Sequence, residues 1–103
     1  NQVTVVIPEG ELDMAAAPEI EQTLKGLIDE GKTKLVVDLG GVSYLDSSAL
    51  GELVRAMKRA RQAGGDLRLC ALRGDVLQIF EMTRLSQAMN VYRARKAAVD
   101  SWK

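Results

Sequence analysis

Residues 35–54 read LVVDLGGVSYLDSSALGELV, and this stretch decides the fold. It opens with Leu35-Val36-Val37, a short continuous apolar run with β-branched members, which is typical of a strand buried on both faces of a parallel sheet. A loop through Gly40-Gly41 then leads to Asp46-Ser47-Ser48. From Ser48 to Ala63 the apolar residues recur at helical spacing. The stretch therefore predicts a buried strand, a polar loop and an amphipathic helix, in that order.

The same alternation of strand and helix continues on both sides of this stretch. Strands are predicted from alternating apolar residues at Val3–Ile7 and Asp66–Ala71, with a short further strand at Met89–Tyr92. Helices are predicted from Pro18 as far as Gly31, from Gly74 onward, and over Arg95–Lys103. This order predicts an α/β domain: a small, mostly parallel sheet of four to five strands with alternating helices packed on it.

The composition excludes several classes of function. The 103 residues carry 14 Lys and Arg against 14 Asp and Glu, with no histidine and a single cysteine, Cys70. Without histidine there is no Ser-His-Asp or Cys-His catalytic centre and no histidine-bound zinc, and one cysteine forms neither an internal disulfide nor a metal-binding cluster. Zero net charge argues against nucleic acid as a direct partner. We therefore predict one domain over residues 1–103 that is not an enzyme and that holds no metal or cofactor.

Cysteine usage and hydropathy bear on the location of the chain. A lone cysteine fits a reducing compartment, and its position in a strand among small apolar residues predicts a packed, inert thiol. The unbroken apolar stretches are only a few residues long, against about 20 for a membrane-spanning helix. The expectation is a cytoplasmic protein with no membrane insertion.

Two loops are candidates for the functional surface, since ligands of open α/β sheets bind at the carboxyl ends of the strands. They are Gly10–Asp13 and Gly40–Ser48. In the second, Asp46-Ser47-Ser48 stands directly before a helix, and one interpretation is that these small polar residues only cap its free N–H groups. The other is a regulated serine: a phosphate adds about −1.5 to −2 charges, which the helix end tolerates but a docked partner does not. The residues alone leave both interpretations open.

Several stretches resemble the STAS domain of anti-anti-sigma factors. They are Gly10-Glu11-Leu12-Asp13, Leu35–Leu39 and Val42–Gly51, followed by Leu67–Cys70 and Val76–Thr83 in the same order. The resemblance covers nearly the whole chain and implies a small STAS-like fold. It also implies an anti-sigma factor antagonist, which binds an anti-sigma factor that is itself usually a serine/threonine kinase and so releases a sigma factor. The kinase would phosphorylate the antagonist, and the phosphorylated antagonist would no longer bind the kinase. A serine phosphatase would restore binding.

The resemblance also implies roles for individual residues. Ser47, directly after the loop aspartate, would be the phosphorylation site. Asp46 would position or hydrogen-bond the acceptor hydroxyl, and Ser48 would cap the helix. Ala49 stands where the family commonly has glycine and is expected among the binding residues. The residues of the other loop that would flank the docking surface are Gly10, Glu11 and Asp13.

Other interpretations of the resemblance remain. The domain could instead dock in a membrane transport assembly as an accessory STAS domain, or belong to a stressosome-like scaffold. A dimer is compatible with each of these. The family usually has an additional strand before the one predicted at Val3–Ile7, and the chain begins at Asn1 within a strand-like stretch. We therefore expect that the first strand, or other N-terminal residues, precede this sequence.

Overall fold

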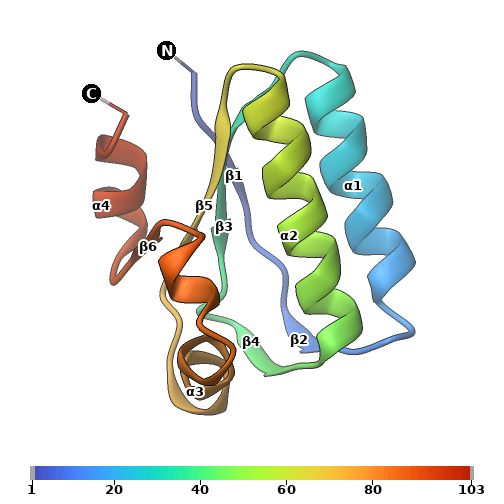
Figure 1. Cartoon of the computed structure of the whole chain (residues 1–103), viewed down its shortest axis with the longest axis vertical. Coiled ribbons are helices and arrows are strands. Elements are labelled where there is room, and N and C mark those ends of the chain that lie inside the picture. The colour runs from blue at the N-terminus through green and yellow to red at the C-terminus, as the bar shows by residue number, and fades with distance from the viewer. Residues whose placement is uncertain (1, 103) are drawn as a thin grey trace.

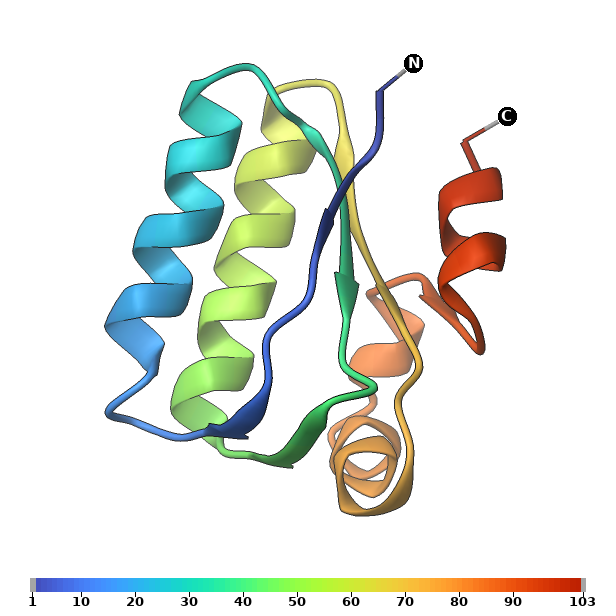
Figure 2. The same cartoon turned by 180° about the vertical axis from the view of Figure 1, so that it is seen from behind.

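Two parallel sheets organise the fold, which is seen from opposite sides in Figures 1 and 2. The computed structural model describes residues 2–102. The larger sheet has the strand order β1-β3-β5-β6, with bounds Thr4–Val6, Lys34–Asp38, Asp66–Cys70 and Val91–Tyr92. The smaller sheet is a ribbon of β2 (Gly10–Leu12) and β4 (Val42–Leu45). The helices are α1 (Ala17–Asp29), α2 (Ser47–Gln62), α3 (Gly74–Met82) and α4 (Arg95–Asp100), with a short 3-10 turn at Leu85–Gln87. The predicted α/β class with a mostly parallel sheet is confirmed.

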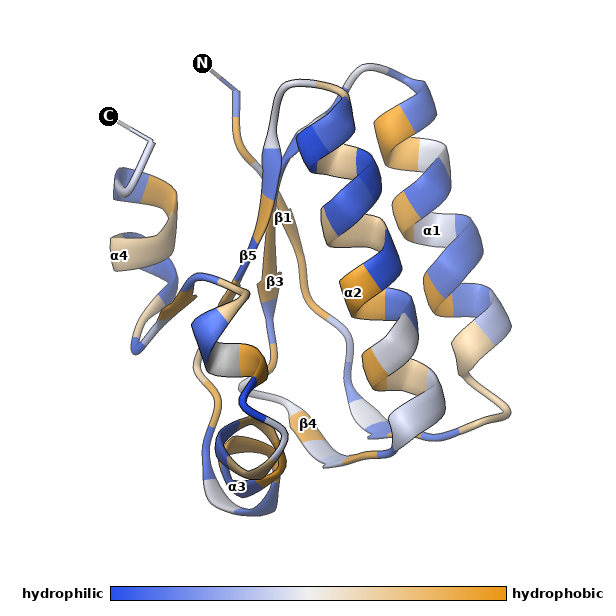
Figure 3. Cartoon of the chain, in the orientation of Figure 1, coloured by the Kyte–Doolittle hydropathy of each residue, from blue (hydrophilic) through white to orange (hydrophobic). Residues whose placement is uncertain are grey.

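The helices cover the two faces of the larger sheet unequally. Helices α1 and α2 lie side by side over one face, whereas α4 alone lies over the other (Figures 1 and 2). Leu35 and Val37 of β3 belong to the large core under α1 and α2, while Val36 belongs to a small core under α4. All three side chains are fully buried, which confirms the prediction of a strand covered on both faces. Figure 3 shows hydrophobic residues along β1 and β3, and patches of them between hydrophilic residues on α1 and α2.

The helix ends follow from local sequence. Gly31 and Gly64 both have left-handed backbone conformations, with φ of +88° and +90°, just after the ends of α1 and α2. Gly65 allows close approach of two chain segments, because a Cβ built there would lie 2.0 Å from the carbonyl oxygen of Thr33. This turn connects α2 to β5, which begins at Asp66.

The structure corrects several predicted bounds. The two segments interpreted as loops, Gly10–Asp13 and Gly40–Ser48, contain the paired strands β2 and β4. These strands are too short to show a strand pattern, and each becomes regular only by pairing with the other. Helix α2 begins at Ser47 instead of Ser48, and β1 is shorter than Val3–Ile7. The predicted terminal helix ends at Asp100, and Lys103 lies outside the described residues.

Within residues 2–102, no helix combines the length and the apolar character that a membrane crossing requires.

Candidate functional site at the β2–β4 ribbon

The β2–β4 ribbon joins the two predicted functional loops. Glu11 lies opposite Tyr44 and Leu12 lies opposite Leu45 in the parallel register. The ribbon is closed at one end by the Gly10 N–H, which donates to the Gly41 carbonyl oxygen at 2.9 Å. At the other end the Asp46 N–H donates to the Leu12 carbonyl oxygen at 3.1 Å. Segments more than 30 residues apart in sequence thus form one continuous surface, as the sequence predicts for loops at the carboxyl ends of parallel strands.

The side chains of the ribbon divide between the core and solvent. Leu12 and Leu45 are buried in the large core, with 5% and 0% of their surface exposed. Their neighbours Glu11 and Tyr44 point away and are exposed, Tyr44 to 47%. Asp46 directly follows the end of β4 and is half-buried. The outer side of the ribbon therefore combines an exposed aromatic ring with the Glu11 carboxylate.

Asp46 is the N-cap of α2. Its backbone is extended, its Oδ1 accepts the N–H of Ala49 at 3.0 Å, and its carbonyl oxygen accepts the N–H of Leu50 at 3.0 Å. The helix thus begins at Ser47, which is exposed, and Ser48 lies half-buried in the first turn. The expectation that Ser48 caps the helix is wrong, because the capping oxygen belongs to the residue before the helix. The expected hydrogen bond from the Ser47 hydroxyl to Asp46 stays a prediction.

Substitutions at this helix end test the assignment of the cap. Asp46→Ala removes the acceptor of the Ala49 N–H, so we expect the free energy of unfolding to fall by about 1 kcal/mol. Ser48→Ala is the matched control and is expected to change it by less than about 0.5 kcal/mol. Urea denaturation followed by circular dichroism measures both values. A larger loss of unfolding free energy for Ser48→Ala than for Asp46→Ala would indicate that Ser48 caps the helix after all.

Asp13 shapes the turn after β2 but does not cap a helix, because the N-cap of α1 is Ala16, which has no side-chain capping hydrogen bond. Oδ1 of Asp13 accepts the N–H groups of Ala15 at 3.0 Å and Ala16 at 3.2 Å, and so shapes the turn that leads into α1. Met14 protrudes from this turn with 72% of its surface exposed. Two aspartates that each follow a strand of the ribbon therefore accept backbone N–H groups: Asp46 at the start of α2, and Asp13 in the turn before α1.

The sequence prediction of the site omitted its two exposed apolar side chains. Neither Met14 nor Tyr44 was named individually, although Tyr44 falls within the candidate loop Gly40–Ser48, and both lie beside the named residues. Tyr44 occupies an exposed position of β4. Its exposure could not be expected from the sequence because β4 was not predicted as a strand. Aromatic and methionine side chains are enriched in protein interfaces, so their exposure here points to a docking surface.

Ala49 lies inside the fold. Its side chain is fully buried in the large core beside Leu45 and Leu53, and only its N–H takes part in the site, as the donor to Asp46. Its predicted place on the binding surface is therefore corrected. Alanine fits the first turn of α2 without strain and fills space in the core.

The site offers a hydroxyl and a charged, partly apolar surface. The Ser47 hydroxyl group belongs to an exposed residue at the start of a 16-residue helix, where the helix dipole favours negative charge.

Among residues 2–102, no three His, Cys, Asp or Glu side chains gather in a way that could hold a metal ion. Cys70 is fully buried, and burial, together with the charge of Asp38, raises the pKa of its thiol to about 11, as expected for a packed, unreactive cysteine.

The chain is similar in sequence to known proteins. The sequence model of the STAS domain matches residues 1–98 of the chain. The anti-sigma-B factor antagonist of Staphylococcus aureus is 34% identical over 82 residues, which cover 80% of this chain and 76% of that relative.

Two solved structures share the fold at lower sequence identity. The Bacillus cell fate determinant SpoIIAA in its phosphorylated form gives a TM-score of 0.75 at 22% identity, over 98% of this chain and 91% of that one. The murine anion transporter Slc26a9 gives a TM-score of 0.76 at 20% identity, over 94% of this chain but only 17% of the transporter. The same fold thus makes up most of one of these chains and a small part of the other.

Proposed function

The chain belongs to the STAS domain family of anti-sigma factor antagonists, and from this premise we propose that it binds an anti-sigma factor and is switched off by phosphorylation of Ser47. Binding would displace a sigma factor from the anti-sigma factor. The anti-sigma factor would itself be the serine/threonine kinase, and a serine phosphatase would reverse the modification. The chain would contribute an acceptor hydroxyl and a docking surface, and the kinase would contribute the catalytic groups.

The exposure of Ser47 at the first position of α2 is the observation that carries this proposal. The residue stands at the edge of the ribbon surface, where Tyr44 and Met14 are also exposed. Its neighbours on both sides have structural tasks, since Asp46 caps the helix and Ser48 is half-buried. Ser47 is the residue of the Asp46-Ser47-Ser48 group that an external enzyme reaches with least disturbance of the fold.

The position of Ser47 gives phosphorylation opposite consequences for the fold and for a complex. A phosphate adds about −1.5 to −2 charges, and a helix N-terminus stabilises such charge through its dipole. The domain itself would therefore remain folded. A partner seated over the ribbon would have to desolvate the phosphate beside Asp46 and the exposed Glu11. The modification would thus weaken the complex while it leaves the domain intact.

Phosphate mapping tests the proposed acceptor. The protein is incubated with candidate serine/threonine kinases and ATP, so that the γ-phosphoryl group passes to the Ser47 oxygen and ADP is released. Mass spectrometry then locates the modification. We expect Ser47→Ala to lose the phosphate and Ser48→Ala, the matched control, to retain it. Unchanged stoichiometry in Ser47→Ala would show that the acceptor is another residue.

The likeness to the anion transporter Slc26a9 favours a second candidate function, an accessory domain that docks in a membrane transport assembly. In that case the ribbon surface would bind its partner permanently. Such a domain should bind equally well with or without a negative charge at Ser47. Binding measurements on charged and neutral variants of this serine therefore separate the two candidates.

A further inference from the structure

Helix α4 alone covers the second face of the larger sheet. Below it lies a small core of Val36, Cys70 and Ala98, all fully buried. Val99 and Trp102 pack against the edge of this core and are only partly buried. The large core on the opposite face contains no residue of α4. Removal of α4 would therefore uncover one face of the sheet while the core under α1 and α2 stays intact.

Helix α4 has little stability of its own. It has only six residues, and its N-cap, Ala94, makes no side-chain capping hydrogen bond. Arg95 and Lys96 stand at its N-terminal end and Asp100 at its C-terminal end, which is the unfavourable arrangement for the helix dipole. Helices this short are unstable in isolation, so α4 depends on its attachment to the sheet.

One attachment lies at the carboxyl end of β3. The Arg95 Nε donates to Oδ2 of Asp38 at 2.9 Å, while Oδ1 of the same carboxylate accepts the N–H of Gly40 at 2.9 Å. Burial opposes ionisation of Asp38, but the hydrogen bonds from Gly40 and Arg95 outweigh it, and the pKa of Asp38 is lowered. The first turn of α4 is thus tied to a charged, fixed group of the sheet.

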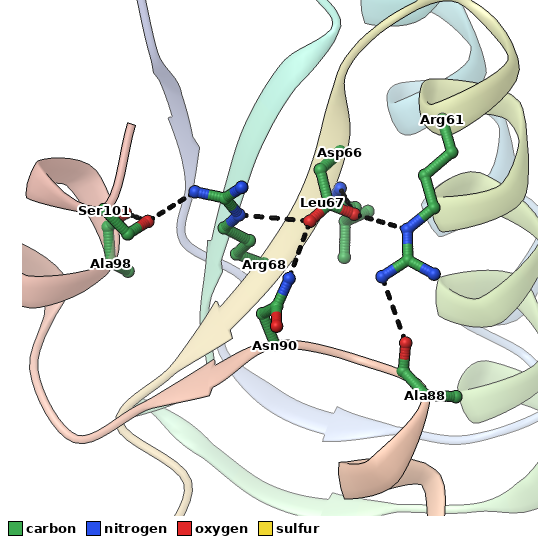
Figure 4. Close-up of polar contacts among 8 residues, drawn as sticks. All are labelled: Arg61, Asp66, Leu67, Arg68, Ala88, Asn90, Ala98 and Ser101. Carbon is green, nitrogen blue, oxygen red and sulfur yellow. Dashed lines mark hydrogen bonds and ion pairs between the residues drawn. The ribbon is translucent and has the colours of Figure 1, made fainter. Parts of the chain in front are cut away.

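The other attachment follows the last turn of α4 and is shown in Figure 4. Arg68 of β5 donates from Nη1 to the Ser101 hydroxyl at 2.6 Å, and its guanidinium lies 3.8 Å from the centre of the Trp102 ring. The same guanidinium is also bound within β5, because its Nε donates to Oδ2 of Asp66 at 3.0 Å. Arg68 therefore belongs to the rigid part of the domain, and Ser101 and Trp102 rest on it.

We propose that α4 is a strap that opens as a separate unit while the rest of the domain stays folded, and that its opening uncovers Val36 and Cys70. The strap is fastened at its two ends, by Arg95 on Asp38 and by Ser101 and Trp102 on Arg68. Between them only Ala98 is fully buried, so the apolar surface that α4 contributes is small. Regions with few buried apolar contacts open at a lower free-energy cost than the global unfolding of a protein.

The chain contains a natural reporter on each side of this contact. Trp102 is the single tryptophan and Cys70 the single cysteine of the sequence. Trp102 lies against Arg68 only while the strap is closed. Cys70 reacts with the disulfide reagent DTNB as a thiolate, which the closed strap disfavours by burial. Opening should therefore change the tryptophan fluorescence and release the thiol at the same time.

Urea titration of the whole chain tests the separate opening. We expect the Trp102 fluorescence to change, and the Cys70 reaction with DTNB to accelerate, at lower urea concentrations than the loss of far-UV circular dichroism from the other helices. The urea dependence of the thiol reaction should be shallow, because opening exposes little surface. A single transition shared by all three signals would overturn the proposal.

Two neighbouring substitutions separate the strap contact from general charge effects. Arg95→Gln removes the bond to Asp38, and we expect the DTNB reaction without urea to become about 5- to 30-fold faster, as for loss of one charge-assisted hydrogen bond. Lys96→Gln removes the same charge from the same helix turn, but among residues 2–102 Lys96 forms its ion pair with Asp100 within α4 itself, so the rate should stay within about twofold. Equal rates for the two variants would contradict the role of Arg95.

Discussion

Replacing Asp66 with alanine is expected to lower the free energy of unfolding by about 3–5 kcal/mol, the cost of removing one partner from a buried ion-pair network. Asp66 is only 6% exposed at the start of β5, and its carboxylate accepts from three side chains. Arg61 of α2 donates to Oδ1 at 2.8 Å, while Arg68 and Asn90 donate to Oδ2 at 3.0 and 2.9 Å (Figure 4). Alanine would leave these donors without an acceptor at the junction of α2, β5 and the segment before β6.

Urea denaturation of the variant measures this loss, with Glu30→Ala as the control. Glu30 also forms an ion pair, 3.4 Å from Lys32, but both side chains are more than half exposed. Exposed pairs contribute about 0–1 kcal/mol, so the control should unfold almost like the wild type. A loss below about 1 kcal/mol for Asp66→Ala would show that water replaces the network without cost.

The pH dependence of stability checks the same network by a separate route. Burial opposes ionisation of Asp66, but the hydrogen bonds from Arg61, Arg68 and Asn90 outweigh it, so its pKa is lowered in the folded state. Its contribution is therefore complete above the unfolded value of about 3.9 and is lost as the pH falls through the lower folded pKa. Wild-type stability should fall over this acidic range, and Asp66→Asn, which cannot titrate, should show a shallower fall.

The strongest elements of the fold could be predicted because their signals are local. The apolar run at Leu35-Val36-Val37 predicted a strand buried on both faces, and the spacing of apolar residues after Ser48 predicted α2 to within one residue at each end. The glycines at 31 and 64 marked the helix ends, since both adopt left-handed backbone conformations. Each of these features depends on neighbouring residues alone.

Features that depend on distant partners could not be predicted in the same way. Strands β2 and β4 have three and four residues, and their regularity comes from pairing across the fold. Asp66 was predicted only as the first residue of a strand, since two of its three side-chain partners come from other elements, Arg61 of α2 and Asn90 before β6. The exposure of Tyr44 likewise became visible only with the ribbon in place.

The candidate site also combines features that could be predicted from local sequence with features that could not. Ser47, Asp46 and the Gly10–Asp13 segment could be named from sequence, and the structure places them along one ribbon. The assignment of the cap to Ser48 was wrong, because the boundary of a helix is the least certain part of a pattern. Ala49 was expected at the surface, although a small residue in a first helical turn also suits a tightly packed core.

Replacing Ser47 with aspartate is expected to weaken the complex with an anti-sigma factor by about a hundredfold, equivalent to about 2.7 kcal/mol. The added carboxylate would be desolvated in the complex beside Asp46, which carries the same charge. Stability should not fall, because an acidic side chain at the N-terminus of a helix is favourable by about 0.3–1 kcal/mol. Isothermal titration calorimetry with the anti-sigma factor, and thermal unfolding of the variant alone, measure the two quantities.

Two matched variants isolate the cause of the weakening. Ser47→Ala removes the hydroxyl without adding charge and should bind like the unmodified protein, locked in the active state. Ser48→Asp places the same charge one residue further along the same helix end, at a half-buried position, and should weaken binding several-fold less than Ser47→Asp. Equal weakening by both aspartates would assign the effect to the overall charge of the helix end. Unchanged affinity for Ser47→Asp would instead indicate permanent docking. If a negative charge at Ser47 does not change the binding affinity, a phosphate on the same residue cannot switch the complex off.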